Sequence, residues 1–210
     1  MLFKRLVIGT MENNAYIIAD EDSRDAAVFD APFNAAPICE YLMANNLQLK
    51  YIMLTHGHFD HITAVEGILE KFPSAKVVAH TNCDIMFANT ANNLTARYCR
   101  KPFTLTADIK VDDSDILKVG NIDVKVLYTP GHSCDSVCYL VEDKLFSGDT
   151  LFRLEVGRAD FPTGSLEEEI SSIVNKLYTL PPDTKVYPGH GEETTIAYEV
   201  AGNPYTKGKV

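Results

Sequence analysis

The sequence lacks features that would assign it to several common classes of protein. No apolar run approaches the ~20 residues of a membrane span, and the N-terminal segment has no apolar stretch long enough for a secretory signal. The five cysteines are odd in number and include no Cys-x-x-Cys pair, which argues against a disulfide framework. We therefore predict a cytoplasmic protein whose cysteines are free thiols.

Basic residues are also scarce. The 19 Lys and Arg residues are outnumbered by 29 Asp and Glu residues, which gives a formal net charge of −10. Binding to a nucleic-acid backbone or to an anionic membrane surface depends on clustered basic side chains. We therefore expect neither nucleic acid nor membrane as a partner, and the oligomeric state stays open.

The remaining composition is that of an ordinary globular protein, 46% hydrophobic over 210 residues, without repeats or linker-like segments. It predicts a single domain over residues 1–210.

β-type runs bounded by turn residues predict strands over 2–9, 15–20, 26–30, 49–55, 75–80, 122–129, 136–142, 144–150 and 184–190. Helical spacing predicts helices over 36–46, 62–72 and 82–89, and a capping box at Ser165 and Glu168 begins another over 166–180. Residues 89–114 are interpreted as a loop or lid. Strands interrupted by helices predict an α/β fold of two sheets with helices outside.

Most of the histidines share one sequence context. Five of the six follow a predicted strand and lie near glycine, and two aspartates occur in similar positions. Loops at strand ends are where proteins commonly place functional side chains. These residues are His56, His58, Asp60 and His61 in LTHGHFDHI, His132 in LYTPGHS, Asp149 in LFSGDT and His190 in VYPGHG. His80 lacks the glycine context, and we interpret it as structural.

The composition of this set indicates a metal centre. Imidazole and carboxylate donors suit zinc, iron or manganese, whereas magnesium and calcium prefer all-oxygen ligands. Seven donors exceed the positions of one tetrahedral ion but match two ions that share a bridging carboxylate. The alternative, that these histidines only cap strands, is weaker because three of them fall within six residues. The sequence therefore predicts a binuclear site completed from distant loops.

The motifs resemble those of the metallo-β-lactamase superfamily, in which HxHxDH is followed by a single His, an Asp and a final His. The stretches GDTLF, Gly157-Arg158 and LPPDTKVYPGHGEET are similar to glyoxalase II and its short, single-domain bacterial relatives. The resemblance implies an αββα four-layer sandwich with the metals in a cleft along one edge. It also implies that one ion takes His56, His58 and His132, that the other takes Asp60, His61 and His190, and that Asp149 bridges them.

The resemblance further implies a thioester hydrolase for S-acylglutathione-like small molecules, with S-lactoylglutathione the first to test. A metal-bridging hydroxide, held by Asp149, would attack the thioester carbonyl, because a bound zinc lowers the pKa of water to about 7. The cofactors expected are two divalent ions, with zinc the first choice and iron or manganese the alternatives. Arg158 corresponds to a basic position that contacts glutathione in the family, and Arg153 could assist it.

Some residues depart from the family pattern. Ser133 and Cys134 follow His132 where relatives often have Thr-Pro-Gly, and we expect Cys134 to pack with Cys138 at a strand start. Asp30, in FDAPFN, lies where Asp-Pro-Gly is common. We expect Asp30 to cap the following helix, and the alternative is that it supports the metal site.

Other activities of this superfamily remain as alternatives. An iron-dependent persulfide dioxygenase is disfavoured by the sequence Gly189-His190-Gly191, and a true β-lactamase is disfavoured by Asp149. The net charge disfavours a nuclease. A lactonase stays open, and a non-catalytic metal-binding module is the weakest alternative.

Overall fold

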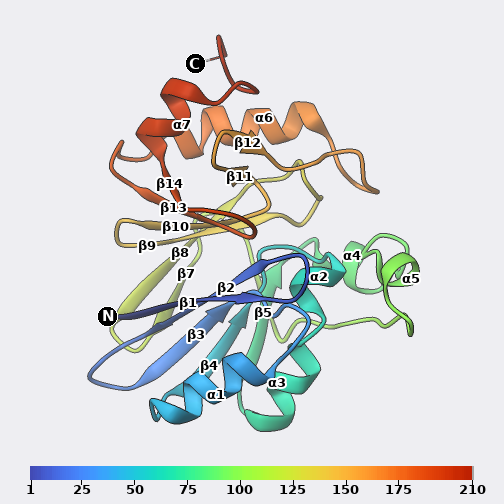
Figure 1. Ribbon diagram of the computed structural model, residues 1–210, viewed down its shortest axis with the longest axis vertical. Helices are drawn as coiled ribbons and strands as arrows, with labels where there is room; N and C mark the ends of the chain where they lie inside the picture. The colour runs from blue at the N-terminus through green and yellow to red at the C-terminus, as the bar shows by residue number, and fades with distance from the viewer. Residues whose placement is uncertain (210) are drawn as a thin grey trace.

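The structure, a computed structural model, describes residues 1–209 and is built around two six-stranded sheets (Figure 1). The N-terminal sheet contains, in spatial order, β1 (Leu2–Ile8), β2 (Asn13–Ala19), β3 (Asp25–Phe29), β4 (Gln48–Met53), β5 (Lys76–His80) and β6 (Ile109–Val111). The C-terminal sheet contains β14 (Thr194–Thr195), β13 (Lys185–Pro188), β10 (Lys144–Gly148), β9 (Val137–Val141), β8 (Ile122–Tyr128) and β7 (Ile116–Val119). A separate two-stranded ribbon is formed by β11 (Leu151–Phe152) and β12 (Glu155–Val156).

Helices cover the outer face of each sheet, and Figure 1 shows the resulting four layers. Those on the N-terminal side are α1 (Ala36–Ala44), α2 (Phe59–Ile62) and α3 (Val65–Lys71), with α4 (Cys83–Phe87) and α5 (Thr95–Tyr98) at one end. Those on the C-terminal side are α6 (Leu166–Asn175) and α7 (Ile196–Gly202). The predicted αββα sandwich is therefore confirmed.

The core between the sheets follows from the two-residue period of the strands. In β2, Tyr16 and Ile18 face the other sheet, whereas Ala15 and Ile17 pack on the helical side. Phe29 of β3 stacks on Phe146 of β10 with ring centroids 4.1 Å apart. Both side chains are buried, so truncating either to alanine is expected to destabilise the fold by about 3–5 kcal/mol.

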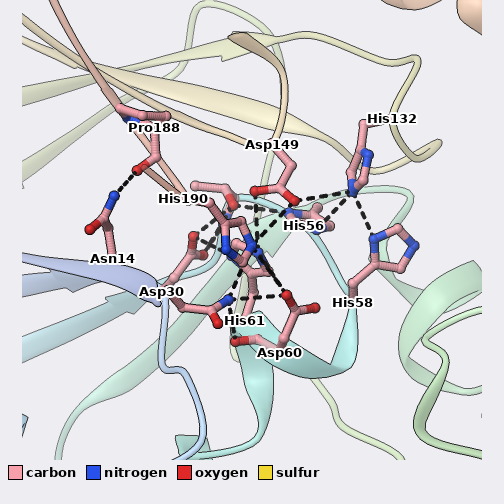
Figure 2. A network of polar contacts seen from close by, with 12 residues as sticks. Asn14, Asp30, His56, His58, Asp60, His61, His132, Asp149, Pro188 and His190 are labelled. Carbon is pink, nitrogen blue, oxygen red and sulfur yellow. Dashed lines mark hydrogen bonds and ion pairs between the residues drawn. The ribbon is translucent and has the colours of Figure 1, made fainter. Parts of the chain in front are cut away.

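Strand ends from both sheets meet at one edge of the sandwich. β3 and β4 are parallel in one sheet, and β10 and β13 are parallel in the other. The two sheets are joined there, because the Asn14 amide donates to the Gly189 carbonyl at 2.7 Å and Asn13 forms a bridge with His190. The Asn14 side chain also donates to the carbonyl of Pro188 (Figure 2). The loops after β4, β10 and β13 are thereby brought close together.

Several elements differ from the sequence-based prediction. The helix predicted over 62–72 is interrupted between α2 and α3, because the Ala64 amide donates to the Ala31 carbonyl instead of continuing the helix. The helix predicted over 166–180 begins as expected, with Ser165 accepting from the Glu168 amide, but ends at Asn175 before a 3₁₀ turn at Leu177–Thr179. The segment 89–114 is not only a loop, since it contains α5 and β6. No helix within residues 1–209 has the length and apolar character needed to cross a membrane.

Candidate metal centre

The LTHGHFDHI segment is positioned by β4 and α2. The chain leaves β4 after Met53, and His58 is the N-cap of the short helix that carries Asp60 and His61. Gly57 allows the intervening loop to pack closely, because a Cβ atom there would lie 2.5 Å from Cβ of Met86. The motif is thus held between the sheet and α4, and its four polar side chains project to the sheet edge (Figure 2).

Three imidazoles form the first group of donors, which we call the imidazole cluster: His56, His58 and His132. Nδ1 of His58 lies 2.8 Å from Nε2 of His132, which in turn lies 3.2 Å from Nε2 of His56. All three are buried, and burial lowers the pKa of each, that of His58 to about 3. The cluster therefore consists of neutral imidazoles at ordinary pH.

A second group, the acidic cluster, consists of Asp60, His61 and His190. Oδ2 of Asp60 lies 3.3 Å from Nε2 of His190 and 3.6 Å from Nε2 of His61. Burial alone would lower the pKa of His61, but the surrounding carboxylates, Asp149 foremost, raise it well above its ordinary value. Burial likewise opposes ionisation of Asp60, yet the nearby His61 charge holds the pKa of that carboxyl at about 2.

Asp149 lies between the two clusters (Figure 2). Its Oδ1 is 3.3 Å from Nε2 of His61, and its Oδ2 is 3.7 Å from Nε2 of both His132 and His190. Gly189 permits this approach, since a Cβ atom at that position would lie 2.3 Å from Oδ1 of Asp149. One carboxylate therefore borders both groups of donors.

In His132 and His190, the ring nitrogen that points away from the clusters is hydrogen-bonded, which leaves the nitrogen that faces the clusters available as a metal ligand. Nδ1 of His132 donates to the Arg158 carbonyl at 2.7 Å, and Nδ1 of His190 donates to the Met11 carbonyl at 3.0 Å. A nitrogen that donates to a carbonyl carries the proton, so the Nε2 lone pair faces the cluster. Nε2 of His61 and Oδ1 of Asp149 are buried and lie 3.3 Å apart, but neither atom makes a hydrogen bond of good geometry. This donor set fits two cations, one beside each cluster.

Asp30 differs from its predicted role as a helix cap. It is buried, its Oδ2 accepts from Nδ1 of His61 at 2.8 Å, and its Oδ1 accepts from the Thr55 amide. The start of α1 is instead bonded by Asn34, whose Oδ1 accepts from the Ala36 amide. The capping prediction is wrong, and the alternative holds: Asp30 orients a donor of the acidic cluster, as carboxylates behind metal-binding histidines commonly do.

Two buried acids that support the site were missed by the sequence analysis. Glu169 of α6 is fully buried, and its Oε2 accepts from the His132 amide at 2.7 Å. Burial raises the pKa of Glu169 to about 9, so its carboxyl group is neutral. Its position four residues before Ile173, on the buried face of the helix, was the available signal. Asp135, also buried, accepts from the Ser133 hydroxyl, and burial raises its pKa to about 6.

The two predicted substrate-binding arginines line a cavity of about 480 Å³ that opens onto Asp149. Each is held in an ion pair: Arg158 binds both carboxylate oxygens of Asp160, and Arg153 lies 2.5 Å from Glu192. Their contact with a substrate therefore stays a prediction.

The remaining singled-out residues lie outside the two donor clusters. Cys134 is half-buried against the core of the N-terminal side, and its amide donates to the Thr163 hydroxyl, whereas Cys138 is fully buried in the core of the C-terminal side. The prediction that the two cysteines pack together is therefore wrong. His80 stacks on Tyr128 with centroids 3.9 Å apart, as a structural histidine would.

The profile of the metallo-beta-lactamase superfamily matches residues 8–190, so the chain belongs to this superfamily. It is 35% identical to "Probable metallo-hydrolase YqgX" of Bacillus subtilis (strain 168), with 99% of each chain covered. It is also 35% identical to the "Hydroxyacylglutathione hydrolase" of Francisella tularensis subsp. novicida, over 86% of this chain and 64% of that enzyme.

Solved structures agree with this family membership. The BLEG-1 B3 metallo-beta-lactamase matches with a TM-score of 0.91 at 36% identity, covering 99% of this chain and all of that one. ETHE1 from Myxococcus xanthus matches with a TM-score of 0.82 at 32% identity, covering 97% and 84%. TTHA1623, solved in a di-iron-bound form, matches with a TM-score of 0.84 at 27% identity, covering 96% and 99%. Fold, donor set and relatives together define a metal-dependent hydrolase of this superfamily.

Proposed function

We propose that the protein is a thioester hydrolase for S-acylglutathione-type substrates, working with two divalent metal ions. One ion would be held by the imidazole cluster and the other by the acidic cluster, with Asp149 shared between them. The observation that carries this proposal is the position of the Asp149 carboxylate, within 3.7 Å of His132 on one side and His190 on the other. When bound, the two ions would supply an activated water and Lewis acidity toward the substrate carbonyl.

The protein groups behind the donors would keep the site rigid. Asp30 fixes the ring of His61, and the carbonyls of Arg158 and Met11 fix those of His132 and His190. Such contacts set both the tautomer and the orientation of a metal-binding imidazole. The donors are thus oriented before any ion arrives, which limits the reorganisation needed during catalysis.

The charge state of the site favours a thiol as leaving group. The pKa values of Asp60 and Asp149 lie below their ordinary range, so neither carboxyl group carries a proton to donate near neutral pH. A thiol with a pKa of about 8.5 leaves readily as a thiolate, whereas an amine leaving group requires a proton. This supports thioester over amide hydrolysis. Arg158 and Arg153 are the proposed contacts for the carboxylates of glutathione. These carboxylates would replace Asp160 and Glu192 as the partners of the two arginines.

The nature of the metal is a further part of the proposal. Histidine and carboxylate donors accept zinc, iron and manganese. We propose zinc, and the di-iron form of TTHA1623 makes iron the main alternative.

The test begins with elemental analysis of protein purified without added metal, followed by thiol release from a panel of acyl-thiols that includes S-lactoylglutathione. We expect close to two metal ions per chain and release of free thiol. Fully metal-loaded protein that hydrolyses no member of the panel would contradict the proposal. In that case oxygen uptake with glutathione persulfide, and hydrolysis of a lactone and a β-lactam, would identify the alternative activity.

A further inference from the structure

One wall of the cavity beside the metal centre is apolar, and two of its four side chains belong to the segment that follows α4. Phe59, Leu94, Tyr98 and Phe161 all line the cavity. Figure 1 places α4 and α5 next to α2, at the end of the N-terminal sheet. We call these four side chains the apolar wall.

The apolar wall is attached directly to the metal-binding motif. The amide of Phe59, the residue between His58 and Asp60, donates to the Asn93 carbonyl at 2.9 Å. The buried side chain of Asn93 accepts from the Thr95 amide and hydroxyl at 3.0 and 2.7 Å. It also donates to the carbonyl of Phe103. Hydrogen bonds of Asn93 therefore stabilise the segment that carries Leu94 and Tyr98 and connect it to the metal-binding motif.

Leu94 occupies an unusual backbone conformation. Its φ of 63° lies in the left-handed region, which is unfavourable for a residue with a Cβ atom and favours Gly or Asn. Its side chain nevertheless lines the cavity and is almost fully buried. The hydrogen bonds of Asn93 hold this backbone in place, so that the buried Leu94 side chain forms part of the cavity wall.

Aromatic rings extend this surface to the imidazole cluster. The Tyr98 ring stacks on Phe59 with centroids 4.8 Å apart. Phe161 lies edge-on to His58 at 5.4 Å and to His132 at 6.3 Å. The apolar wall thus continues to within van der Waals reach of the donors that would face the substrate carbonyl.

The part of the cavity next to His190 has a different character. There Gly191, Glu192 and Arg153 offer a backbone and a charged pair, alongside the apolar side chains of Met11 and Phe152. Among the described residues that line the cavity, the basic side chains Arg153 and Arg158 are both already paired with carboxylates. The charged side chains suit a peptide-like thiol carrier. Arg158 covers the Phe161 ring at 4.4 Å, so the uncharged part of the apolar wall is formed by Phe59, Leu94 and Tyr98, which suit a group without charge.

We propose that the apolar wall binds the acyl chain of the substrate, so that the preferred substrates are thioesters of extended apolar acyl groups rather than small polar ones such as lactoyl. This inference rests on the proposed thioester hydrolysis and adds its specificity. Burying one methylene group against such a surface is expected to raise kcat/KM by up to about fourfold.

The kinetic test uses acyl chains from acetyl to octanoyl on two carriers, glutathione and N-acetylcysteamine. In the wild type, kcat/KM rises with each added methylene on both carriers. Leu94→Gly removes the side chain and suits the left-handed backbone, and Tyr98→Ala removes a half-exposed ring, so both variants are expected to fold. Both flatten the dependence on chain length by at least half, whereas Tyr205→Ala, which removes an exposed tyrosine outside the cavity, leaves it unchanged.

A binding test separates this inference from the proposed function. Calorimetric titration of metal-loaded protein with S-ethyl-, S-butyl- and S-hexylglutathione measures contact with the chain without any reaction. Affinity that rises with chain length in the wild type and not in Leu94→Gly supports the apolar wall as the acyl site. Affinity independent of chain length in the wild type overturns it, even if thioesters are hydrolysed. If affinity rises with chain length but no thioester is hydrolysed, the thioesterase proposal alone is refuted.

Discussion

The imidazole cluster and the acidic cluster come from one short motif but differ in charge. His56 and His58 belong to the first, and Asp60 and His61, a few residues later, belong to the second. The first is a set of buried neutral rings whose pKa values are lowered by burial. The second contains a carboxylate and is bordered by Asp30 and Asp149, so it retains positive charge on His61 when no metal is bound.

The difference shows how the chain tolerates so many polar groups at one sheet edge. Burying a neutral imidazole costs little free energy, whereas a buried carboxylate requires a nearby cation. In the metal-free protein a proton on His61 meets that requirement, and a divalent ion would replace it. The carboxylate charge should also give the acidic cluster the higher affinity for a divalent ion.

The largest effect is expected from removing the carboxylate that both clusters share. Asp149→Asn keeps the size of the side chain but weakens the hold on both ions. Losing Lewis-acid stabilisation worth several kcal/mol should lower thioester hydrolysis by roughly 10²–10³-fold. Steady-state kinetics and elemental analysis measure the two consequences. Wild-type activity at wild-type metal content in this variant would show that Asp149 is not shared.

A pair of variants separates the clusters from each other. His58→Ala damages only the imidazole cluster, and His190→Ala damages only the acidic cluster. We expect each to retain close to one ion per chain. Under chelator competition, the ion left in His58→Ala should be held more tightly, because its site keeps the carboxylate of Asp60. Equal affinities in the two variants would contradict the charge difference.

A smaller effect is expected from the group behind His61. Asp30→Asn removes the negative charge that accepts from Nδ1 of His61 but leaves a side chain of the same size. Replacing such a partner typically lowers metal affinity by about 10–100-fold. Chelator titration against zinc measures the loss, with Asp123→Asn, an exposed aspartate on β8, as the matched control. An Asp30→Asn protein that binds metal like the control would assign Asp30 a purely structural role.

The smallest expected effect concerns Asp135, a buried acid beside the loop of His132. Burial raises its pKa from 3.8 to about 6, so the folded protein binds this proton more tightly than the unfolded chain does. Its contribution to stability is present at low pH and is lost as pH rises from about 4 to 6. Between pH 4.5 and pH 7 the wild type should lose roughly 2 kcal/mol relative to Asp135→Asn. Urea unfolding of both proteins at the two pH values measures the difference, and parallel curves would contradict the buried ionisation.

Most of the fold could be predicted because its strands carry strong local signals. The apolar runs that became β2, β4, β8 and β13 are bounded by turn residues, and the Ser165 capping box marks the start of α6. The strands β7 and β14 and the helix α7 were missed. They are short. Pairing with β8 and β13 selects the strands β7 and β14, whereas α7 does carry a local start signal, the Thr195 hydroxyl that accepts from the Tyr198 amide.

The donor clusters could be anticipated because each donor follows a strand, and strand ends gather at a sheet edge. The partners behind the donors could not. The local sequence around Asp30 favours a helix start. Its actual hydrogen bond, to His61, spans 31 residues and leaves no local signal. Glu169 lies in a run of three glutamates that looks solvent-exposed. Its spacing to Ile173 was the one sequence signal for burial, and the packing of α6 on the His132 loop explains it.

The central claim is that two cations occupy neighbouring sites that share Asp149. Anomalous diffraction from crystals grown with zinc tests it most directly. We predict two peaks: one within about 2.0–2.2 Å of nitrogens from His56, His58 and His132, and another at that distance from donors of Asp60, His61 and His190. A single peak, or none between these side chains at saturating zinc, would contradict the account.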